Sequence, residues 1–329
     1  MLGSIFDSLH VLSLPTKTNF RGVTSREVAL FQGPAGWAEF SPFLEYDATE
    51  CVPWLASAIE SASVAAPVPV WPAIKINATL PAVNGREKIA EVLSWFPQCQ
   101  VIKVKVGGNF EEDLARLSLL KELVPGTRIR IDVNGGWSVS QAAIYILRLY
   151  GEVENIEYVE QPCATIEELR LLKRQLPAQI LIAGDEVIRK AKDPLSLELA
   201  GAVDILILKV APLGGIQRAL EITNHYGLPV VVSSALESAV GISYGLKLAS
   251  ALPTLSYASG LGTGALLSSD VAELPLVAGA IKVRSVLPES SALLGYAVSG
   301  ARLDWWRERI RQTWLAGAQS WIQREGWSL

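Results

Sequence analysis

The chain has 329 residues, of which 50% are hydrophobic and 19% are charged, and its formal net charge is −4. This composition excludes a disordered or fibrous chain, and the lack of any basic block or stripe argues against a nucleic acid partner. No signal peptide is indicated, and three cysteines at spacings that match no metal motif favour free thiols in a reducing cytoplasm.

Residues 1–70 are expected to form an α+β unit of their own. The turn sequence Gly-Pro-Ala-Gly at 33–36 lies between two β-prone runs and predicts a hairpin. A helical pattern follows over 51–63, and the Ala- and Pro-rich stretch at 63–74 indicates a domain boundary.

Strand-like runs alternate with helical patterns over residues 71–265. One of these helices is predicted to begin at Thr165, because Glu168 three residues later completes a capping-box signature. The strand-like runs are apolar on both faces, which is typical of parallel strands buried on both sides. They cover residues 74–80, 100–106, 128–134, 156–161, 180–186, 203–210, 229–236 and 254–261.

Eight such strands predict an α/β protein with a (β/α)8 TIM-type barrel. The alternative is an open doubly wound sheet. That fold is expected to carry a Gly-rich phosphate-binding turn after its first strand, where this chain reads NATLPAVNG.

The alternation ends near residue 266, and residues 266–329 form a separate C-terminal segment. Positions 306, 310 and 314 fall on one helical face, which predicts a packed amphipathic helix. The uncharged stretch from Leu248 to Ser269 is not expected to span a membrane. It contains Pro253 and many glycines and hydroxyl groups, whereas a span needs about 20 predominantly apolar residues.

Charged residues lie at the ends of five consecutive apolar runs. They are Lys103 with Lys105, then Asp132, Glu160, Asp185 and Lys209, and the intervals from Lys105 onward are 27, 28, 25 and 24 residues. Each interval is about one strand, one loop and one helix. The charged groups are therefore expected at one level of the sheet, at the carboxyl ends of the strands, where barrel enzymes carry their active sites.

The acids and the lysines at these positions suit different roles. Asp132, Glu160 and Asp185 offer only oxygen ligands, which suit a hard cation such as Mg²⁺, for which Mn²⁺ can substitute. Lys103 and Lys105 are two apart on a strand and point the same way. Repulsion between their ammonium groups should lower the pKa of each, as a general base requires.

Lys209 lies on the sixth strand, across an eight-strand ring from the lysine pair. A base on one side and a cation on the other would bracket a small carboxylate substrate, an arrangement that suits removal of the proton next to the carboxylate. By strand alternation Glu186 should point away from Asp185, whereas Asn134 should share a face with Asp132.

The order of these residues resembles the muconate lactonising subgroup of the enolase superfamily, whose sites pair a Lys or His base with Mg²⁺. The motifs are Lys103-Val-Lys105, Asp132-Val-Asn134, Glu160, Asp185-Glu186 and Lys209 through Gly214-Gly215. Within the subgroup, the segments FRGVTSREVALFQGPAGWAEFSPFLEYD, INATLPAV, SSALESAVGI and SGLGTGALL are most similar to the o-succinylbenzoate synthase family. The resemblance also implies that residues 266–329 complete the N-terminal cap.

The resemblance implies a role for each site residue. Lys105 would take the α-proton of 2-succinyl-6-hydroxy-2,4-cyclohexadiene-1-carboxylate and then assist the loss of hydroxide on the same face. The product would be o-succinylbenzoate, a precursor of menaquinone. The other implied roles are Mg²⁺ binding by Asp132, Glu160 and Asp185, stabilisation of the enediolate by Lys209, tuning of Lys105 by Lys103, and substrate contacts from Ser233, Ser234, Gly262 and Arg21.

Three alternatives stay open from the sequence. An N-succinylamino acid racemase or dipeptide epimerase would use Lys105 and Lys209 as opposing bases. A Schiff-base aldolase would use Lys209 alone and leave the three acids without a role. A binding protein without catalysis would leave all six charged positions unexplained, and the sequence does not indicate an oligomeric state.

Overall fold

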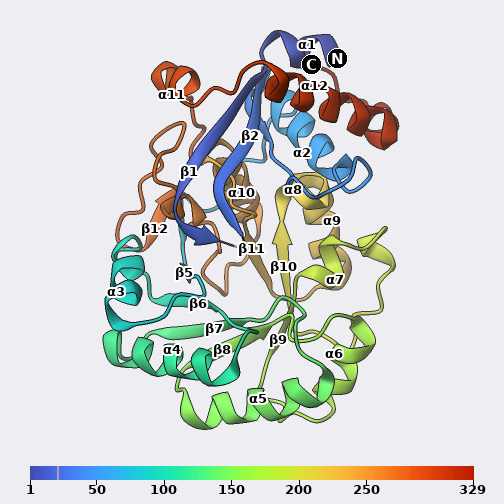
Figure 1. Ribbon diagram of the computed structural model, residues 1–329. Helices are drawn as coiled ribbons and strands as arrows, with labels where there is room; N and C mark the ends of the chain where they lie inside the picture. Colours follow the sequence, from blue (N-terminus) through green and yellow to red (C-terminus); the bar gives the residue numbers. More distant parts are fainter. Residues whose placement is uncertain (21) are drawn as a thin grey trace.

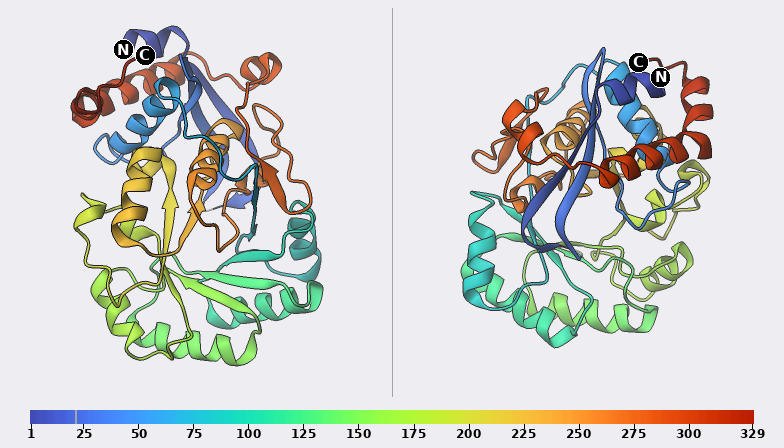
Figure 2. Two further views of the ribbon diagram at one scale, coloured as in Figure 1. Left: turned by 180° about the vertical axis from the view of Figure 1, so that it is seen from behind. Right: turned by 45° about the horizontal axis from the view of Figure 1, so that its top comes forward.

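The computed structural model describes residues 1–20 and 22–329, and the expected substrate contact Arg21 lies outside the described residues. A cap built from both ends of the chain lies against a curled parallel sheet with helices on its outer side (Figures 1 and 2). The two termini lie close together on the cap. In the described part of the chain, no helix is long and apolar enough to cross a membrane.

The N-terminal part of the cap is an antiparallel sheet covered by helices. Strands β1 (His10–Phe20) and β2 (Val23–Gly33) form a long hairpin, and β3 (Gly36–Phe40) pairs with β2. The hairpin predicted at 33–36 is confirmed, because Gly33 and Gly36 are register partners. Helix α2 (Val52–Ser63), which has Pro53 in its first turn, packs on β3, and the chain begins with α1 (Leu2–Asp7).

The central sheet has seven strands in the described residues, in the order β11-β10-β9-β8-β7-β6-β5, and all of its pairings are parallel. The strands are β5 (Ala78–Leu80), β6 (Val101–Lys105), β7 (Arg128–Asp132), β8 (Ile156–Glu160), β9 (Ile182–Gly184), β10 (Ile205–Lys209) and β11 (Val230–Ser233). The helices that follow them are α3 (Arg86–Ser94), α4 (Phe110–Leu123), α5 (Val139–Glu152), α6 (Ile166–Lys173), α7 (Glu186–Arg189), α8 (Val210–Leu213), α9 (Ile216–Tyr226) and α10 (Ala239–Ala251).

Local sequence explains where these helices begin. The capping box predicted at Thr165 is confirmed: the Glu168 backbone N–H donates to Thr165 Oγ1 over 3.2 Å, and the Thr165 N–H donates to Glu168 Oε2 over 2.9 Å. Ser138 and Gln141 form a second capping box at the start of α5. Each box satisfies backbone donors that a helix N-terminus otherwise leaves without partners.

The eighth strand predicted at 254–261 is reduced to two isolated bridges, and these close the barrel. Ser259 bridges to Ile76, and Gly260 bridges to Ser233 of β11. The Gly260 N–H donates to the Val232 carbonyl over 2.8 Å. The predicted barrel is therefore confirmed, with its eighth strand reduced to these two bridges. The first predicted strand is also divided, into β4 (Ala73–Lys75), which pairs with β12 (Ala280–Lys282), and β5.

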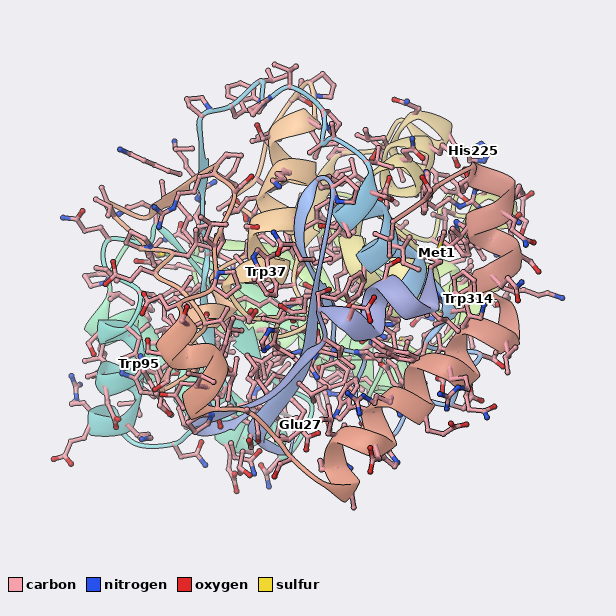
Figure 3. The ribbon with its side chains drawn as sticks, turned by 90° about the horizontal axis from the view of Figure 1, so that it is seen from above. Met1, Glu27, Trp37, Trp95, His225 and Trp314 are labelled. Carbon is pink, nitrogen blue, oxygen red and sulfur yellow. The ribbon has the colours of Figure 1, made fainter. Side chains whose placement is uncertain are left out.

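The last helices of the chain pack against helix α2 of the cap. Trp306 and Ile310 of α12 (Ala301–Thr313) are fully buried in the same hydrophobic cluster as Phe40 and Ile59, as the predicted amphipathic face requires. The Trp306 indole N–H donates to Glu27 Oε2 over 2.6 Å, and Figure 3 shows Glu27 between the β1–β2 hairpin and these helices. The remaining elements are η1 (Pro194–Ser196), η2 (Thr263–Leu266), α11 (Ser290–Gly295), the π-turn Trp314–Ala318 and α13 (Gln319–Glu325).

Candidate active site

The strand register brings the charged residues to one level. Lys105 is the register partner of Asp132, and Asp132 is the register partner of Glu160. Asp185 follows directly after β9, and Lys209 ends β10. Because β6 and β10 are four places apart in the sheet, the two lysine positions face each other across the ring. The common level predicted from the sequence intervals is confirmed.

Ion pairs join the lysines to the acids inside the barrel mouth. Lys103 Nζ lies 2.6 Å from Glu160 Oε1 and 2.9 Å from Asp132 Oδ2. Lys105 Nζ is paired with Asp132 Oδ2 and donates to Asn134 Oδ1 over 2.7 Å. Lys103 and the acids are buried, the acids to 0–1% exposure, whereas Lys105 and Asn134 are partly buried. Pairing of this kind is what makes buried charge tolerable.

A second ion pair lies across the ring from the first. Lys209 Nζ lies 2.6 Å from Asp185 Oδ2, and Arg189 Nε lies 3.2 Å from Asp185 Oδ1. Burial by itself would raise the pKa of Asp185, but the charges of Lys209 and Arg189 lower it to about 2. Asp185 is therefore ionised in the folded chain at neutral pH.

The two lysines of β6 differ in their electrostatics. Burial lowers the pKa of Lys105, and the neighbouring Lys103 charge lowers it further against the opposing effect of Asp132. For Lys103, burial also acts to lower the pKa, but the charges of Asp132 and Glu160 outweigh it and raise the pKa. The expectation that repulsion lowers both values is confirmed for Lys105 and wrong for Lys103, which lies between two carboxylates.

Glu160 is the acid whose charge is least favoured in this cluster. Burial raises its pKa to about 7, and the charge of Asp132 adds to the shift against the effect of Lys103. Asp132 behaves oppositely, since burial is outweighed by Lys103 and Lys105 and its pKa falls below the ordinary value.

Sequence reasoning missed Glu186 and Arg189, which lie at the edge of this cluster. Glu186 was expected to point away, but Glu186 Oε1 accepts from Asn134 Nδ2 over 3.1 Å and from Arg189 over 2.8 Å. The expectation is wrong because α7 begins at Glu186, so strand alternation ends at Asp185. Asn134 does share the face of Asp132, as predicted, since both contact Lys105.

Apolar groups border the charged cluster below and above. Tyr158, Ile205, Ile207 and Val231 form a buried cluster from β8, β10 and β11. On the cap side, the ring of Phe20 at the end of β1 has its centroid 5.9 Å from Lys105 Nζ. Such borders exclude water and strengthen electrostatic interactions within the site.

The structure gives the predicted substrate contacts different surroundings. Ser233 is the register partner of Lys209 and so lies at the level of the charged groups. The Ser234 hydroxyl donates to the Gly260 carbonyl over 2.7 Å and lies 2.8 Å from Thr263 Oγ1. It therefore joins the end of β11 to the segment that closes the barrel. Gly262 lines a separate pocket of about 310 Å³.

The donor set of the three acids fits a divalent cation. All donors are carboxylate oxygens, which hard cations prefer, and Glu160 Oε2 and Asp185 Oδ1 are buried oxygens without a hydrogen-bond partner. As the side chains stand, no group of three His, Cys, Asp or Glu residues within the described ranges is arranged to hold a metal ion. Asp132, Glu160 and Asp185 are the residues that would hold the ion, which would supply positive charge beside the ammonium groups of Lys103 and Lys209.

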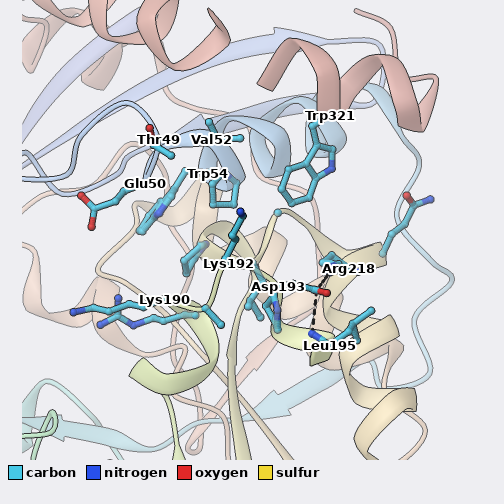
Figure 4. Close-up of a pocket in the computed structure, with 18 of the residues that line it drawn as sticks. Thr49, Glu50, Val52, Trp54, Lys190, Lys192, Asp193, Leu195, Arg218 and Trp321 are labelled. Atoms are coloured by element: carbon cyan, nitrogen blue, oxygen red, sulfur yellow. Dashed lines mark hydrogen bonds and ion pairs between the residues drawn. The ribbon is translucent and has the colours of Figure 1, made fainter. Parts of the chain in front are cut away.

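A larger pocket, of about 850 Å³, lies beside this site between the cap and the barrel. Figure 4 shows Lys192 reaching into it between Trp54 and Trp321. None of the six charged residues of the barrel mouth lines it, and its lining carries acids and bases in nearly equal number. The charge cluster therefore remains the candidate active site.

Comparison with known proteins agrees with this architecture. Residues 11–62 match the enolase N-terminal domain-like family, and residues 88–285 match the enolase C-terminal domain-like family. The chain is 47% identical over 313 residues to the o-succinylbenzoate synthase of Mycolicibacterium smegmatis, covering 94% of this chain and 96% of that one. The chain belongs to the o-succinylbenzoate synthase family of the enolase superfamily.

Solved structures of the superfamily share the fold. The muconate lactonizing enzyme of Pseudomonas fluorescens aligns with a TM-score of 0.73 at 20% identity, covering 88% of this chain and 98% of that one. The N-succinyl Arg/Lys racemase of Bacillus cereus aligns with a TM-score of 0.71 at 18% identity, covering 88% and 97% of the two chains. As a member of the o-succinylbenzoate synthase family, the chain is an enzyme of the lyase class, and enolase-superfamily sites use a divalent metal ion.

Proposed function

We propose that this enzyme dehydrates 2-succinyl-6-hydroxy-2,4-cyclohexadiene-1-carboxylate to o-succinylbenzoate, a step in menaquinone biosynthesis. The observation that carries the proposal is the arrangement of Lys105 and Lys209 on opposite sides of a buried ring of three acids, in a chain 47% identical to a synthase of that name. The cytoplasmic location stays a prediction.

The proposed reaction removes one proton and one hydroxide from neighbouring ring carbons. The Lys105 amine takes the proton next to the substrate carboxylate and becomes an ammonium group. The carbon–oxygen bond to the hydroxyl then breaks, the ammonium returns its proton to the leaving hydroxide, and water and the aromatic product result. Burial of Lys105 supports the first step, because it lowers the pKa of the amine toward the range of a general base.

Proton removal places new negative charge on the substrate carboxylate. We assign its stabilisation to Lys209, which lies across the ring from Lys105. Lys103 is held by Glu160 and Asp132, and its positive charge would disfavour protonation of the Lys105 amine before the reaction. Mg²⁺ held by Asp132, Glu160 and Asp185 would supply further positive charge for the carboxylate.

A second candidate is an N-succinylamino acid racemase on the same scaffold. It is favoured by the placement of two lysines on opposite faces of the site, which could add and remove the same α-proton. A dipeptide epimerase is less suited, because the segment 259–262 at the end of the eighth stave reads Ser-Gly-Leu-Gly and offers no acid for an α-amino group.

One experiment separates these functions. The purified enzyme is assayed spectrophotometrically with the cyclohexadiene carboxylate, with and without Mg²⁺, beside a racemisation assay with N-succinylamino acids. Mg²⁺-dependent formation of o-succinylbenzoate supports the proposal. Racemisation without dehydration would contradict it and favour the second candidate.

A further inference from the structure

Two buried glutamates of the cap reach into the barrel. Glu39 lies on β3 and is 7% exposed, and Glu60 lies on α2 and is 2% exposed. Neither has a role in the proposed chemistry. Both accept hydrogen bonds at the N-terminus of a barrel helix, and those helices follow β10 and β11.

Glu60 caps α9, the helix after the strand that carries Lys209. The backbone N–H groups of Ile216 and Gln217 donate to its two carboxylate oxygens over 2.6 and 3.0 Å, and the Tyr244 hydroxyl donates over 2.7 Å. Gly215 makes room for this carboxylate, since a Cβ on Gly215 would lie 1.6 Å from Glu60 Oε2. The Gly-Gly pair after Lys209 thus forms a cradle for a cap residue.

Glu39 caps α10, the helix after the strand that ends at Ser233. Its carboxylate accepts from the Ser238 backbone N–H over 3.1 Å, from the Ser238 hydroxyl over 2.6 Å and from the Gly241 N–H over 3.0 Å. Arg26 of β2 donates to the Leu236 carbonyl over 3.0 Å in the same loop. Leu236 has a φ of +65°, which a leucine adopts only when its surroundings hold it there.

At α9, Glu60 takes the place of a local side-chain cap, because the N-cap residue is Gly215. At α10, Glu39 adds to the Ser238 hydroxyl, which accepts from the Val240 N–H, and to Asp270, which accepts from the Ala239 N–H. The first N–H groups of a helix lack intrahelical partners and carry a partial positive charge, so a carboxylate there is strongly favoured. The links from these caps back to the site are short and buried: α8 is buried throughout and joins Lys209 to Gly214. A shift of the cap would therefore move the carboxyl ends of β10 and β11.

We propose that Glu39 and Glu60 are positioning residues, through which the docked cap sets the places of Ser233 and Lys209 in the active site. The inference rests on the proposed function. It assigns the two glutamates separate effects: Glu60 acts on Lys209 and on stabilisation of developing charge, and Glu39 acts on the β11–α10 loop and on substrate binding.

Glu60→Gln and Glu39→Gln test this division. In each variant an NH₂ group replaces one carboxylate oxygen, so the side chain loses its negative charge and one of its two acceptors with little change in volume, and the cap is weakened. Glu60→Gln should lower kcat by about tenfold or more with KM within about twofold, whereas Glu39→Gln should raise KM by about tenfold with a smaller change in kcat.

Glu27→Gln is the matched control. Glu27 is a cap glutamate that accepts from Trp306 and Arg302, both in the C-terminal part of the cap. Its loss should lower the thermal unfolding temperature and leave kcat and KM within about twofold of wild type. If the Glu39 and Glu60 variants had the same kinetic constants as Glu27→Gln, or changed kcat and KM in parallel, the proposal would be overturned.

Amide hydrogen exchange provides a readout that does not depend on turnover. Glu60→Gln should speed exchange at Ile216 and Gln217 only, and Glu39→Gln at Ser238 and Gly241 only, at matched global stability. Unchanged exchange at these amides would overturn the proposal even if activity fell. A wild-type enzyme that failed to form o-succinylbenzoate, yet showed these local changes, would instead count against the proposed function alone.

Discussion

Lys105 and Asp132 are register partners on adjacent parallel strands, and their side chains form an ion pair inside the barrel mouth. The amine therefore lies among the acids, buried and beside a second ammonium group. Its pKa is lowered by burial although a carboxylate contacts it. Asp132 therefore holds the Lys105 side chain in place, while burial keeps the pKa of the amine low, as a general base requires.

Replacing Lys105 by alanine should remove the base and leave the fold intact. General-base catalysis contributes about 10²- to 10⁴-fold, so kcat for dehydration should fall by about that factor while the far-UV circular dichroism is unchanged. Lys282→Ala is the control, because Lys282 is an exposed lysine of β12. Near wild-type turnover by the Lys105 variant would contradict the assignment.

Replacing Lys209 by alanine should affect both activity and stability. It removes the partner 2.6 Å from Asp185 and leaves a buried carboxylate held by Arg189 alone. Loss of one partner of a buried ion pair costs about 3 kcal/mol, and the loss should appear as a lower urea midpoint in metal-free buffer. Added Mg²⁺ should restore part of this stability, since a cation would again face Asp185. Absence of any effect would remove Lys209 from the cluster.

Glu160→Gln should weaken Mg²⁺ binding by about tenfold or more, as measured by calorimetry. The amide keeps the size of the side chain but removes a charged ligand, whereas Glu157→Gln on the same strand alters an acid that pairs with Arg128 and Arg130 instead. Removal of metal by chelation should abolish turnover of the wild-type enzyme. Equal Mg²⁺ affinity in the two variants would exclude Glu160 as a ligand.

Glu237 should make stability depend on pH. Burial raises its pKa to about 7, helped by the charge of Glu39, whereas an unfolded glutamate has a pKa of about 4.3. The folded chain holds this proton more tightly, so its contribution to stability is present at low pH and is lost as the pH rises through about 7. Glu237→Gln should flatten the fall in the free energy of unfolding between about pH 4.3 and pH 7. An unchanged slope in urea titrations would contradict this.

Gly215→Ala should disrupt the contact between cap and barrel. The added Cβ would meet Glu60, and a φ of +123° is strained for alanine, so we expect a loss of about 2 kcal/mol or more. Gly215→Ala and Glu60→Gln disturb the same contact between Glu60 and the start of α9. Their effects on the free energy of unfolding should therefore be less than additive in a double-mutant cycle. Simple additivity would show that the cradle and the cap are independent.

The candidate site could be anticipated because its spacing is a property of the chain itself. A strand, a loop and a helix recur at intervals of 24 to 28 residues, and parallel strands in a barrel present their carboxyl ends at one mouth. The positions of Lys105, Asp132, Glu160 and Lys209 follow from those two facts. The Glu186 prediction was wrong because alternation holds only within a strand, and α7 starts at that residue.

By itself, the sequence determined the alternation, the level of the charged groups, and the oxygen-only donor set, since each depends on periodicity and residue type. Only the tertiary structure decided that Lys103 lies between two acids, which raise its pKa. It also decided that the eighth strand is reduced to two bridges, and that Glu39 and Glu60 cap barrel helices. These features depend on which distant residues meet, and a contact between residues 156 positions apart, such as that of Glu60 with Ile216, leaves no local pattern.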